Sequence, residues 1–340
     1  MRRIVAVLSL FLAGSAIIVT SARTTPSEDL TMLSDTYWQW YLRTNPTTAT
    51  SIGIHRYDAL LRDITPAARE SNTAFLEDLL ARIEAVDTTR LDRLERITHK
   101  ALHFQVRRQQ IFLECDFESW NIDPRGAPQA DFLSIQSYQK LSDVDSGRDM
   151  VSRYRAMSPY IEQQIANLSR GLAEGRVATR MAIERTISQI DELESTPLRE
   201  WAALNPLQEI PESWAAAERD AFGNDLEAAV SEGLRPALLL YRDFLRDSLL
   251  PLARDNDHPG LQHIDGGSEC YRSLIFTHTS LELAPEEIHE IGLAEVARIN
   301  QEMREMGKRI LGTDDLDAIH RRLREDPAMH FETRDQVQEK

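Results

Sequence analysis

The sequence predicts an all-α protein, a multi-helix array whose helices are punctuated by prolines. Apolar residues recur at spacings of three and four in nearly every segment, which is the pattern of amphipathic helices. No long stretch alternates polar and apolar residues as strands do, and the best candidate, residues 273–277, is short. We therefore expect more than about half of the residues to be helical, above the roughly one-third of an average globular domain.

Residues 1–22 have the organisation of a secretory signal peptide. Arg2 and Arg3 precede an apolar run over 4–19, and small residues follow at 20–22. We expect this segment to be cleaved and the protein to be exported, either periplasmic or secreted. The alternative is an uncleaved membrane anchor, because the apolar run nearly reaches the roughly 17 residues that span a bilayer.

The mature chain, residues 23–340, is expected to be one acidic helical domain. No later stretch is long and apolar enough to cross a membrane, so no membrane contact is expected after cleavage. Lipidation is not expected either, because Ser15 stands where a lipobox carries its acylated cysteine. The net charge of −16 becomes −18 (−16 − 2) without Arg2 and Arg3, and such a surface repels nucleic-acid phosphates. We therefore expect no nucleic-acid partner.

The first part of the mature chain predicts three helices. One carries apolar residues over 30–41 and ends near Asn45-Pro46. The next begins at Thr65-Pro66, where Thr caps the helix and Pro occupies the first turn, whose N–H needs no partner. The third begins at about Thr89, and its inward side chains are expected to be Leu91, Leu94, Ile97, Ala101 and Leu102.

Irregular stretches and helices alternate in the middle of the chain. Turn residues at 123–128 predict a loop over 120–137. Three prolines over 197–211 mark a second irregular stretch. The helices predicted around these stretches cover residues 147–157, 159–171, 178–193, 214–234 and 236–249.

The last part of the chain predicts one helix from Pro285 and another after Asp314. Acidic residues in the first turn of the former suit the positive end of the helix dipole. Its apolar stripe consists of Val296, Ile299, Met303, Met306 and Ile310. Because the sequence ends within a polar helical pattern, we expect the domain to be incomplete at its C-terminal end and this stripe to be exposed to water.

Nine histidines raise the question of a metal site, and we expect no metal ligands in this chain. His99 and His103 have the spacing of the H-E-x-x-H zinc motif, but Lys100 stands where the catalytic Glu belongs. A His-Glu pair at residues 289–290 has Leu293 in place of the second ligand. We interpret His99 and His103 as solvated histidines beside the core.

Cys115 and Cys270 are the only cysteines. Two cysteines cannot form a zinc ribbon or a disulfide framework, but they could pair with each other in an oxidising compartment. The sequence leaves open whether they do.

Three segments resemble the characteristic block of a large bacterial family, domain-of-unknown-function family 885. They are residues 267–271, 278–281 and 283–292, and weaker agreement extends over the mature chain. Ala284 stands where the family usually has Thr, which loses a helix cap worth roughly 1 kcal/mol. The resemblance implies a predominantly helical, exported protein similar to zinc peptidases of the gluzincin type.

The family's zinc-binding segment lies beyond this block, so the resemblance implies the N-terminal half of a gluzincin-like fold. The chain would form one wall of a peptide cleft and be inactive alone, with zinc bound only when the missing C-terminal half is present. Tyr271 and His278 are then candidate substrate-binding residues, a phenolic donor and a contact for substrate or a developing oxyanion. The alternatives are a buried Tyr with a structurally satisfied His and, for the whole chain, a non-catalytic helical binding or scaffold protein.

Processing of the signal peptide is directly testable. Mass spectrometry of protein from the exported fraction is expected to show a mature N-terminus at Arg23, because small residues precede it. Intact Met1 in a membrane pellet would contradict this expectation.

Overall fold

The computed structural model describes residues 25–338, and 76% of it is helical, which confirms the all-α prediction. Within these residues no strand occurs, and residues 273–277 lie inside a helix. The α-helices are α1 (Pro26–Thr44), α2 (Pro46–Ser51), α3 (Pro66–Glu84), α4 (Arg93–Cys115), α5 (Pro128–Ser134), α6 (Val144–Ala173), α7 (Arg180–Ser195), α8 (Ala216–Ala228), α9 (Arg235–Phe244), α10 (Gly267–Thr279), α11 (Pro285–Ile310), α12 (Leu316–Glu325) and α13 (Arg334–Gln338). The predicted signal peptide and Ser15 lie outside the described residues.

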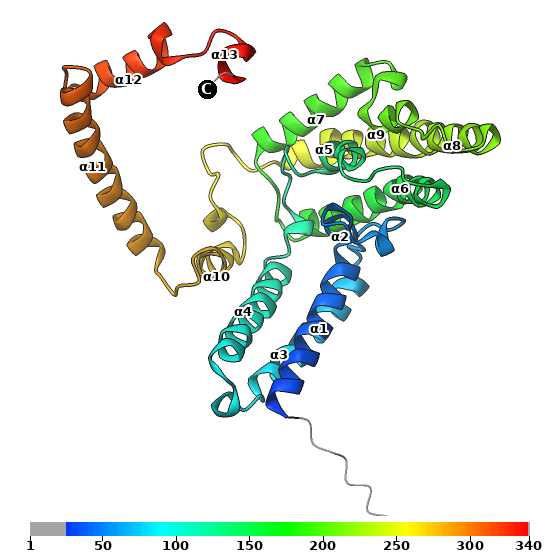
Figure 1. Ribbon diagram of the computed structural model, residues 1–340, viewed down its shortest axis with the longest axis horizontal. Coiled ribbons are helices and arrows are strands. Elements are labelled where there is room, and N and C mark those ends of the chain that lie inside the picture. The colour runs from blue at the N-terminus through cyan, green and yellow to red at the C-terminus, as the bar shows by residue number, and fades with distance from the viewer. Residues whose placement is uncertain (1–24, 339–340) are drawn as a thin grey trace, which may run out of the picture.

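The helices fall into three groups (Figure 1). α1, α3 and α4 lie side by side in the first group, and α5 to α9 form the second. α10 packs against α4, while α11, α12 and α13 form an arm that extends away from both groups. None of the helices described is long and apolar enough to cross a membrane.

An apolar cluster along α1, α3 and α4 holds the first group together. Its buried members are Leu30, Leu33, Trp40, Leu76, Leu79, Ile83, Val86, Leu91, Leu102 and Val106. The helix ends follow the sequence signals: α1 stops before Asn45, and Thr65 accepts a hydrogen bond from the Ala68 amide at the start of α3.

The start of α4 lies later in the sequence than Thr89. Asp92 and Glu95 form a capping box, in which each side chain accepts a hydrogen bond from the other residue's amide, at 2.8 and 2.7 Å. Residues Thr88–Arg90 form a separate 3₁₀ turn. The reciprocal cap therefore decides where this helix begins.

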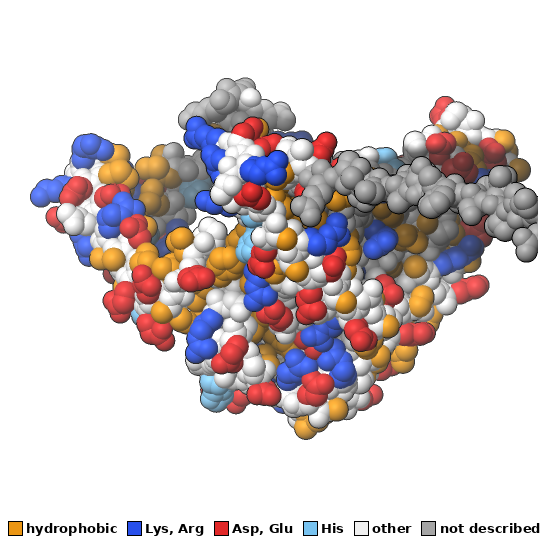
Figure 2. All heavy atoms as spheres, turned by 90° about the horizontal axis from the view of Figure 1, so that it is seen from below, with side chains coloured by type: hydrophobic (Ala, Val, Ile, Leu, Met, Phe, Trp, Pro, Cys, Tyr) orange, Lys and Arg blue, Asp and Glu red, His pale blue; other side chains and the backbone are white. Residues whose placement is uncertain are grey.

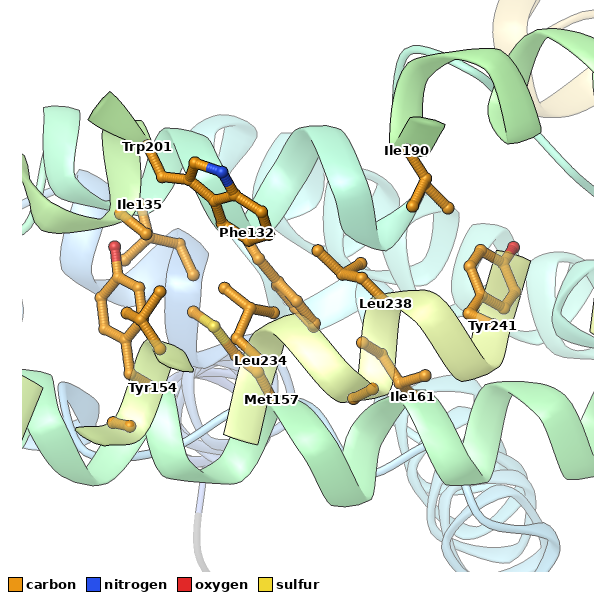
Figure 3. Packing of buried hydrophobic residues seen from close by; sticks show 14 of the residues in the cluster. Phe132, Ile135, Tyr154, Met157, Ile161, Ile190, Trp201, Leu234, Leu238 and Tyr241 are labelled. Carbon is orange, nitrogen blue, oxygen red and sulfur yellow. The ribbon is translucent and has the colours of Figure 1, made fainter. Parts of the chain in front are cut away.

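α6 continues unbroken through Pro159, where the sequence predicted two helices. A proline inside a helix removes one hydrogen bond and costs about 3 kcal/mol. Met157 and Ile161, on either side of it, are fully buried in the core of the second group, and each such burial stabilises by roughly 1.5–3 kcal/mol. Figure 3 shows them beside Leu234 and Leu238, which come from the helix opposite. Packing therefore outweighs the local penalty.

The loop predicted over 120–137 is wrong from Pro128 onward. Pro128 occupies the first turn of α5, and a 3₁₀ turn over Ile135–Ser137 follows that helix. Phe132 and Ile135 are buried in the same core as α6. Tertiary burial thus orders a segment whose local signals are those of a turn.

Arg153 of α6 is fully buried and connects the second group to the chain between α1 and α3. Its Nε donates to the Leu60 carbonyl at 2.8 Å, and its Nη2 donates to the Tyr57 carbonyl at 2.7 Å. Its Nη1 donates to Gln139 Oε1 at 2.7 Å, and Asp58 lies 3.9 Å away. Every nitrogen of the guanidinium therefore has a partner, which is what allows a charged side chain to be buried.

A second buried ionic centre forms at the end of α4. The Asp116 carboxylate is buried and accepts contacts from Arg69 at 2.8 Å, Arg170 at 2.7 Å and Arg176 at 3.0 Å. These arginines come from α3, from the end of α6 and from the turn after it. Asp116 itself has a φ of 48°, a left-handed conformation that Asp tolerates better than most residues. One carboxylate therefore fixes three segments.

Close backbone packing accompanies this centre. A Cβ on Gly171 of α6 would lie 1.8 Å from the backbone oxygen of Ser119, so only glycine allows α6 to approach the turn after α4 this closely. Arg170, the residue before it, is thereby placed against Asp116.

The Asp116 centre makes stability depend on pH. Burial alone raises the pKa of Asp116, but the hydrogen bond from Arg170 and the charges of Arg69 and Arg170 outweigh it and hold the pKa below its ordinary value. A folded-state pKa below the unfolded one means that the carboxylate contributes stability above the unfolded pKa of about 3.9, and that this is lost as pH falls through the folded pKa.

We expect Asp116→Asn, which keeps the shape and the left-handed preference, to lower the free energy of unfolding by about 3 kcal/mol at pH 7, because three arginines lose their buried partner. The loss should shrink below pH 4. Urea titrations at several pH values measure this, with Asp225→Asn, whose carboxylate forms an exposed pair with Arg155, as the control. An acid dependence as steep in Asp116→Asn as in the native chain would exclude this role.

Candidate functional site

α10 is built from a glycine-dependent start and a left-handed end. Gly266, before the first turn, has a φ of 71°, and a Cβ on Gly267 would lie 1.8 Å from the Leu261 carbonyl oxygen. Ser280 ends the helix with a φ of 59°. The chain then turns into α11, so these residues set the direction in which the arm leaves.

A disulfide between Cys115 and Cys270 attaches the first turn of α10 to the last turn of α4. The pairing that the sequence left open is therefore present, between residues 155 positions apart. Further along, the Phe104 and Phe276 rings meet edge to face at 5.4 Å. The later residue of α10, Phe276, contacts the earlier residue of α4, Phe104, while Cys270 is bonded to Cys115 at the end of α4. The two helices are therefore antiparallel.

The two candidate substrate-binding residues lie on the outer side of α10. Tyr271 and His278 are seven residues apart, close to two full helical turns, so both project from one face. Both are exposed, Tyr271 by 44%, whereas Ile275, which lies between them on the same face, is buried. The Tyr is thus not a core residue, and the pair is available to a ligand.

An unpartnered apolar stripe lies next along the chain, on α11. Its side chains on the arm are exposed by 45–66%, and Figure 2 shows hydrophobic side chains along the left of the molecule, where the arm lies. Val296, Ile299, Met306 and Ile310 of the predicted stripe are exposed, whereas Met303 is half-buried, and Ile291 and Leu293 on other faces of α11 are exposed too. Only Gly307 of α11 is buried, and it contacts Ile319 of α12.

Part of α4 is exposed as well, which corrects the predicted inward stripe. Leu91 and Leu102 are buried as expected, but Leu94 and Ile97 are 70% and 54% exposed, and Ala101 is exposed too. Residues 94, 97 and 101 continue along the helix towards Phe104, where α10 packs. Residues 94, 97 and 101 therefore lie on the side of α4 against which α10 packs, but α10 is too short to cover them.

His99 and His103 have a structural role that the sequence did not indicate. His99 Nε2 lies 2.8 Å from the Ile83 carbonyl oxygen, and His103 Nε2 lies 3.3 Å from a Glu84 carboxylate oxygen. Both are half-buried rather than fully solvated, and both contact the last turn of α3. Carbonyls at a helix end lack partners within the helix, so His99 helps to terminate α3, whereas His103 contacts a side chain of the same turn.

Metal-ligand geometry is not found elsewhere in the part of the chain that the structure describes. No three His, Cys, Asp or Glu side chains between residues 25 and 338 group closely enough to hold a metal ion. His289 is exposed on α11. His258 and His263 form an edge-to-face pair at 4.8 Å in the loop before α10, without a third ligand from the described residues.

Sequence reasoning missed a groove between α1 and α4 with a volume of about 280 Å³. Aromatic side chains, amides and two arginines line it, and they come from α1, α3, α4 and the segments between helices, far apart in sequence. No local motif carries such a site. Only the aromatic residues at 37–41 and 112–120 could have suggested it.

Comparison with known proteins gives a family and a fold. A family model described as "Bacterial protein of unknown function (DUF885)" matches residues 46–340. A solved structure, "The crystal structure of the putative lipoprotein from Colwellia psychrerythraea", is similar with a TM-score of 0.81 and 18% identity. The similarity covers 93% of this chain and 57% of that one, so this chain spans little more than half of that protein's length. A search of curated proteins found no match.

Removing the disulfide tests how α10 is held. In the Cys115→Ser/Cys270→Ser double variant we expect amide hydrogen exchange over residues 267–281 to accelerate at least tenfold, because α10 is then held by non-covalent packing alone. The free energy of unfolding should fall by about 2–4 kcal/mol. Exchange in α7, which is remote from α10, serves as the internal control. Unchanged exchange over 267–281 would mean that the disulfide does not position this helix.

Proposed function

The chain belongs to the bacterial protein family DUF885, and we propose that it forms the N-terminal helical wall of a peptide cleft in an exported zinc-metallopeptidase-like hydrolase. In this proposal the zinc ligands come from polypeptide beyond the present sequence, and this chain alone hydrolyses no peptide. The observation that carries the proposal is the exposure of Tyr271 and His278, which project from the same face of a covalently anchored helix two turns apart.

The α10 face has the chemistry to bind a peptide backbone. A tyrosine hydroxyl donates or accepts one hydrogen bond, and a neutral imidazole offers one donor and one acceptor. Neither side chain has a hydrogen-bond partner among the described residues, so a ligand would not have to displace one. Because α10 is bonded to α4 and packs on Phe104, the helix that carries the pair is in place before a ligand arrives, which lowers the entropic cost of binding.

The apolar stripe of α11 supports a second surface in the same region. Exposed apolar patches of this kind mark surfaces that another polypeptide covers. We propose that the segment carrying the zinc ligands packs there and closes the cleft opposite α10. Zinc would then polarise the scissile carbonyl and activate water, while residues of this chain bind and orient the peptide.

A non-catalytic helical binding protein is the second candidate. The same α10 face favours it, because a hydrogen-bonded peptide on that surface needs no zinc. The two candidates differ in what lies beyond Lys340: an H-E-x-x-x-G-H-like segment and zinc-dependent hydrolysis by the longer protein are expected for the hydrolase, and neither for the binding protein.

Peptide affinity tests the proposed role of α10. With a mixed peptide library, we expect Tyr271→Phe and His278→Ala each to weaken binding three- to tenfold, since each removes a hydrogen bond worth about 0.5–1.5 kcal/mol. Isothermal titration measures the change. His320→Ala, an exposed histidine on the distant α12, is the matched control and should bind as the native chain does.

Two results would contradict the proposal. One is a peptide affinity that none of the three substitutions changes. The other is zinc-dependent hydrolysis by the present chain alone that His99→Ala and His103→Ala abolish, since that would move the chemistry to α4.

A further inference from the structure

The groove between α1 and α4 has aromatic walls. Trp40, Tyr41, Phe112 and Phe117 line it, and the groove continues past Arg62 towards the Asp116 centre. Its volume of about 280 Å³ is just below the roughly 300–1,000 Å³ of typical small-molecule pockets. It can therefore hold a ligand about the size of one amino acid.

The walls of the groove are fixed by contacts among its own residues and with Phe75. The Trp40 indole N–H donates to Asn72 Oδ1 at 3.0 Å, and its ring stacks on Phe75 at 5.3 Å. The Asn45 amide donates to the Tyr41 carbonyl at 2.9 Å. A ligand would thus enter a shape that is already formed, at little cost in side-chain ordering.

One positive charge in the groove lacks an acidic partner. Arg108 lies over the Phe112 ring at 5.4 Å and forms no salt bridge with any residue in the described range. The other two charged side chains of the groove, Arg62 and Glu118, pair with each other. Arg107, the neighbour of Arg108 in sequence, lies outside the groove and pairs with Glu114 at 2.8 Å. The groove therefore carries a net charge of about +1 in a strongly acidic protein.

We propose that this groove binds a small monocarboxylate with an aromatic ring, such as an aromatic amino acid or its N-acyl derivative. The ring would stack among Trp40, Tyr41 and Phe112, and the carboxylate would accept hydrogen bonds from the planar guanidinium of Arg108, which suits carboxylates better than a lysine would. Glu118 disfavours a second carboxylate on the ligand. The site does not depend on α10 or on any peptide hydrolysis.

Titration calorimetry with N-acetylphenylalanine tests this site. The native chain is expected to bind it in the millimolar range or tighter, and N-acetylphenylalanine amide, which lacks the charge, at least tenfold more weakly. Arg108→Gln should lose at least tenfold in affinity for the acid but little for the amide. Arg107→Gln, the matched control, should bind both ligands as the native chain does.

Equal affinity of the native chain for acid and amide would overturn the proposal, and so would equal losses in Arg107→Gln and Arg108→Gln. Absence of binding at millimolar acid would overturn it too. If Arg108→Gln does not fold, as circular dichroism would reveal, the comparison of acid with amide on the native chain still decides the matter. Phe112→Leu, which keeps the charge, should weaken both ligands alike by removing the stacking surface.

Discussion

The buried carboxylate of Asp116 is the constraint on which the rest of the molecule depends. Three arginines contact it from α3, α6 and the turn that follows α6. If these segments moved away from Asp116, its charge would be left unpaired. A buried, unpaired carboxylate is costly enough to exclude such arrangements. Cys115 directly precedes Asp116 and is bonded to Cys270 of α10. The contacts that fix Asp116 therefore also fix the point at which α10 is attached. The exposed face that we assign to peptide binding is therefore set by an ionic centre it does not touch.

Two surfaces with different chemistry result from this arrangement. The α10 face offers hydrogen-bonding groups beside the apolar stripe of α11, which suits an extended polypeptide. The groove between α1 and α4 is small, aromatic and positively charged at Arg108, which suits a compact anion. Both lie along the C-terminal half of α4: α10 is joined to it at Cys115 and packs on Phe104, and the groove is lined by Arg108 and Phe112 of the same helix.

The helices were largely predictable, because each signal was local. The spacing of apolar residues by three and four predicted the all-α fold class, and Thr65-Pro66 predicted the start of α3. Errors arose where distant packing decided the outcome: Pro159 stays within α6 because Met157 and Ile161 are buried, and Leu94 and Ile97 are exposed because α10 ends before reaching them. Tyr271 and His278 were singled out by family resemblance and do share an exposed face. Arg108 could not be identified from the sequence, because only the fold shows that it lines the groove and forms no salt bridge with the described residues.

Photochemical cross-linking shows directly whether the α10 face contacts peptide. A benzophenone-labelled peptide would be photolysed with the intact chain, and the adducts located by mass spectrometry. We expect adducts within residues 267–281, and their loss in excess unlabelled peptide or in the Tyr271→Phe/His278→Ala double variant. Adducts confined to other helices, or adducts within 267–281 that unlabelled peptide does not displace, would contradict it.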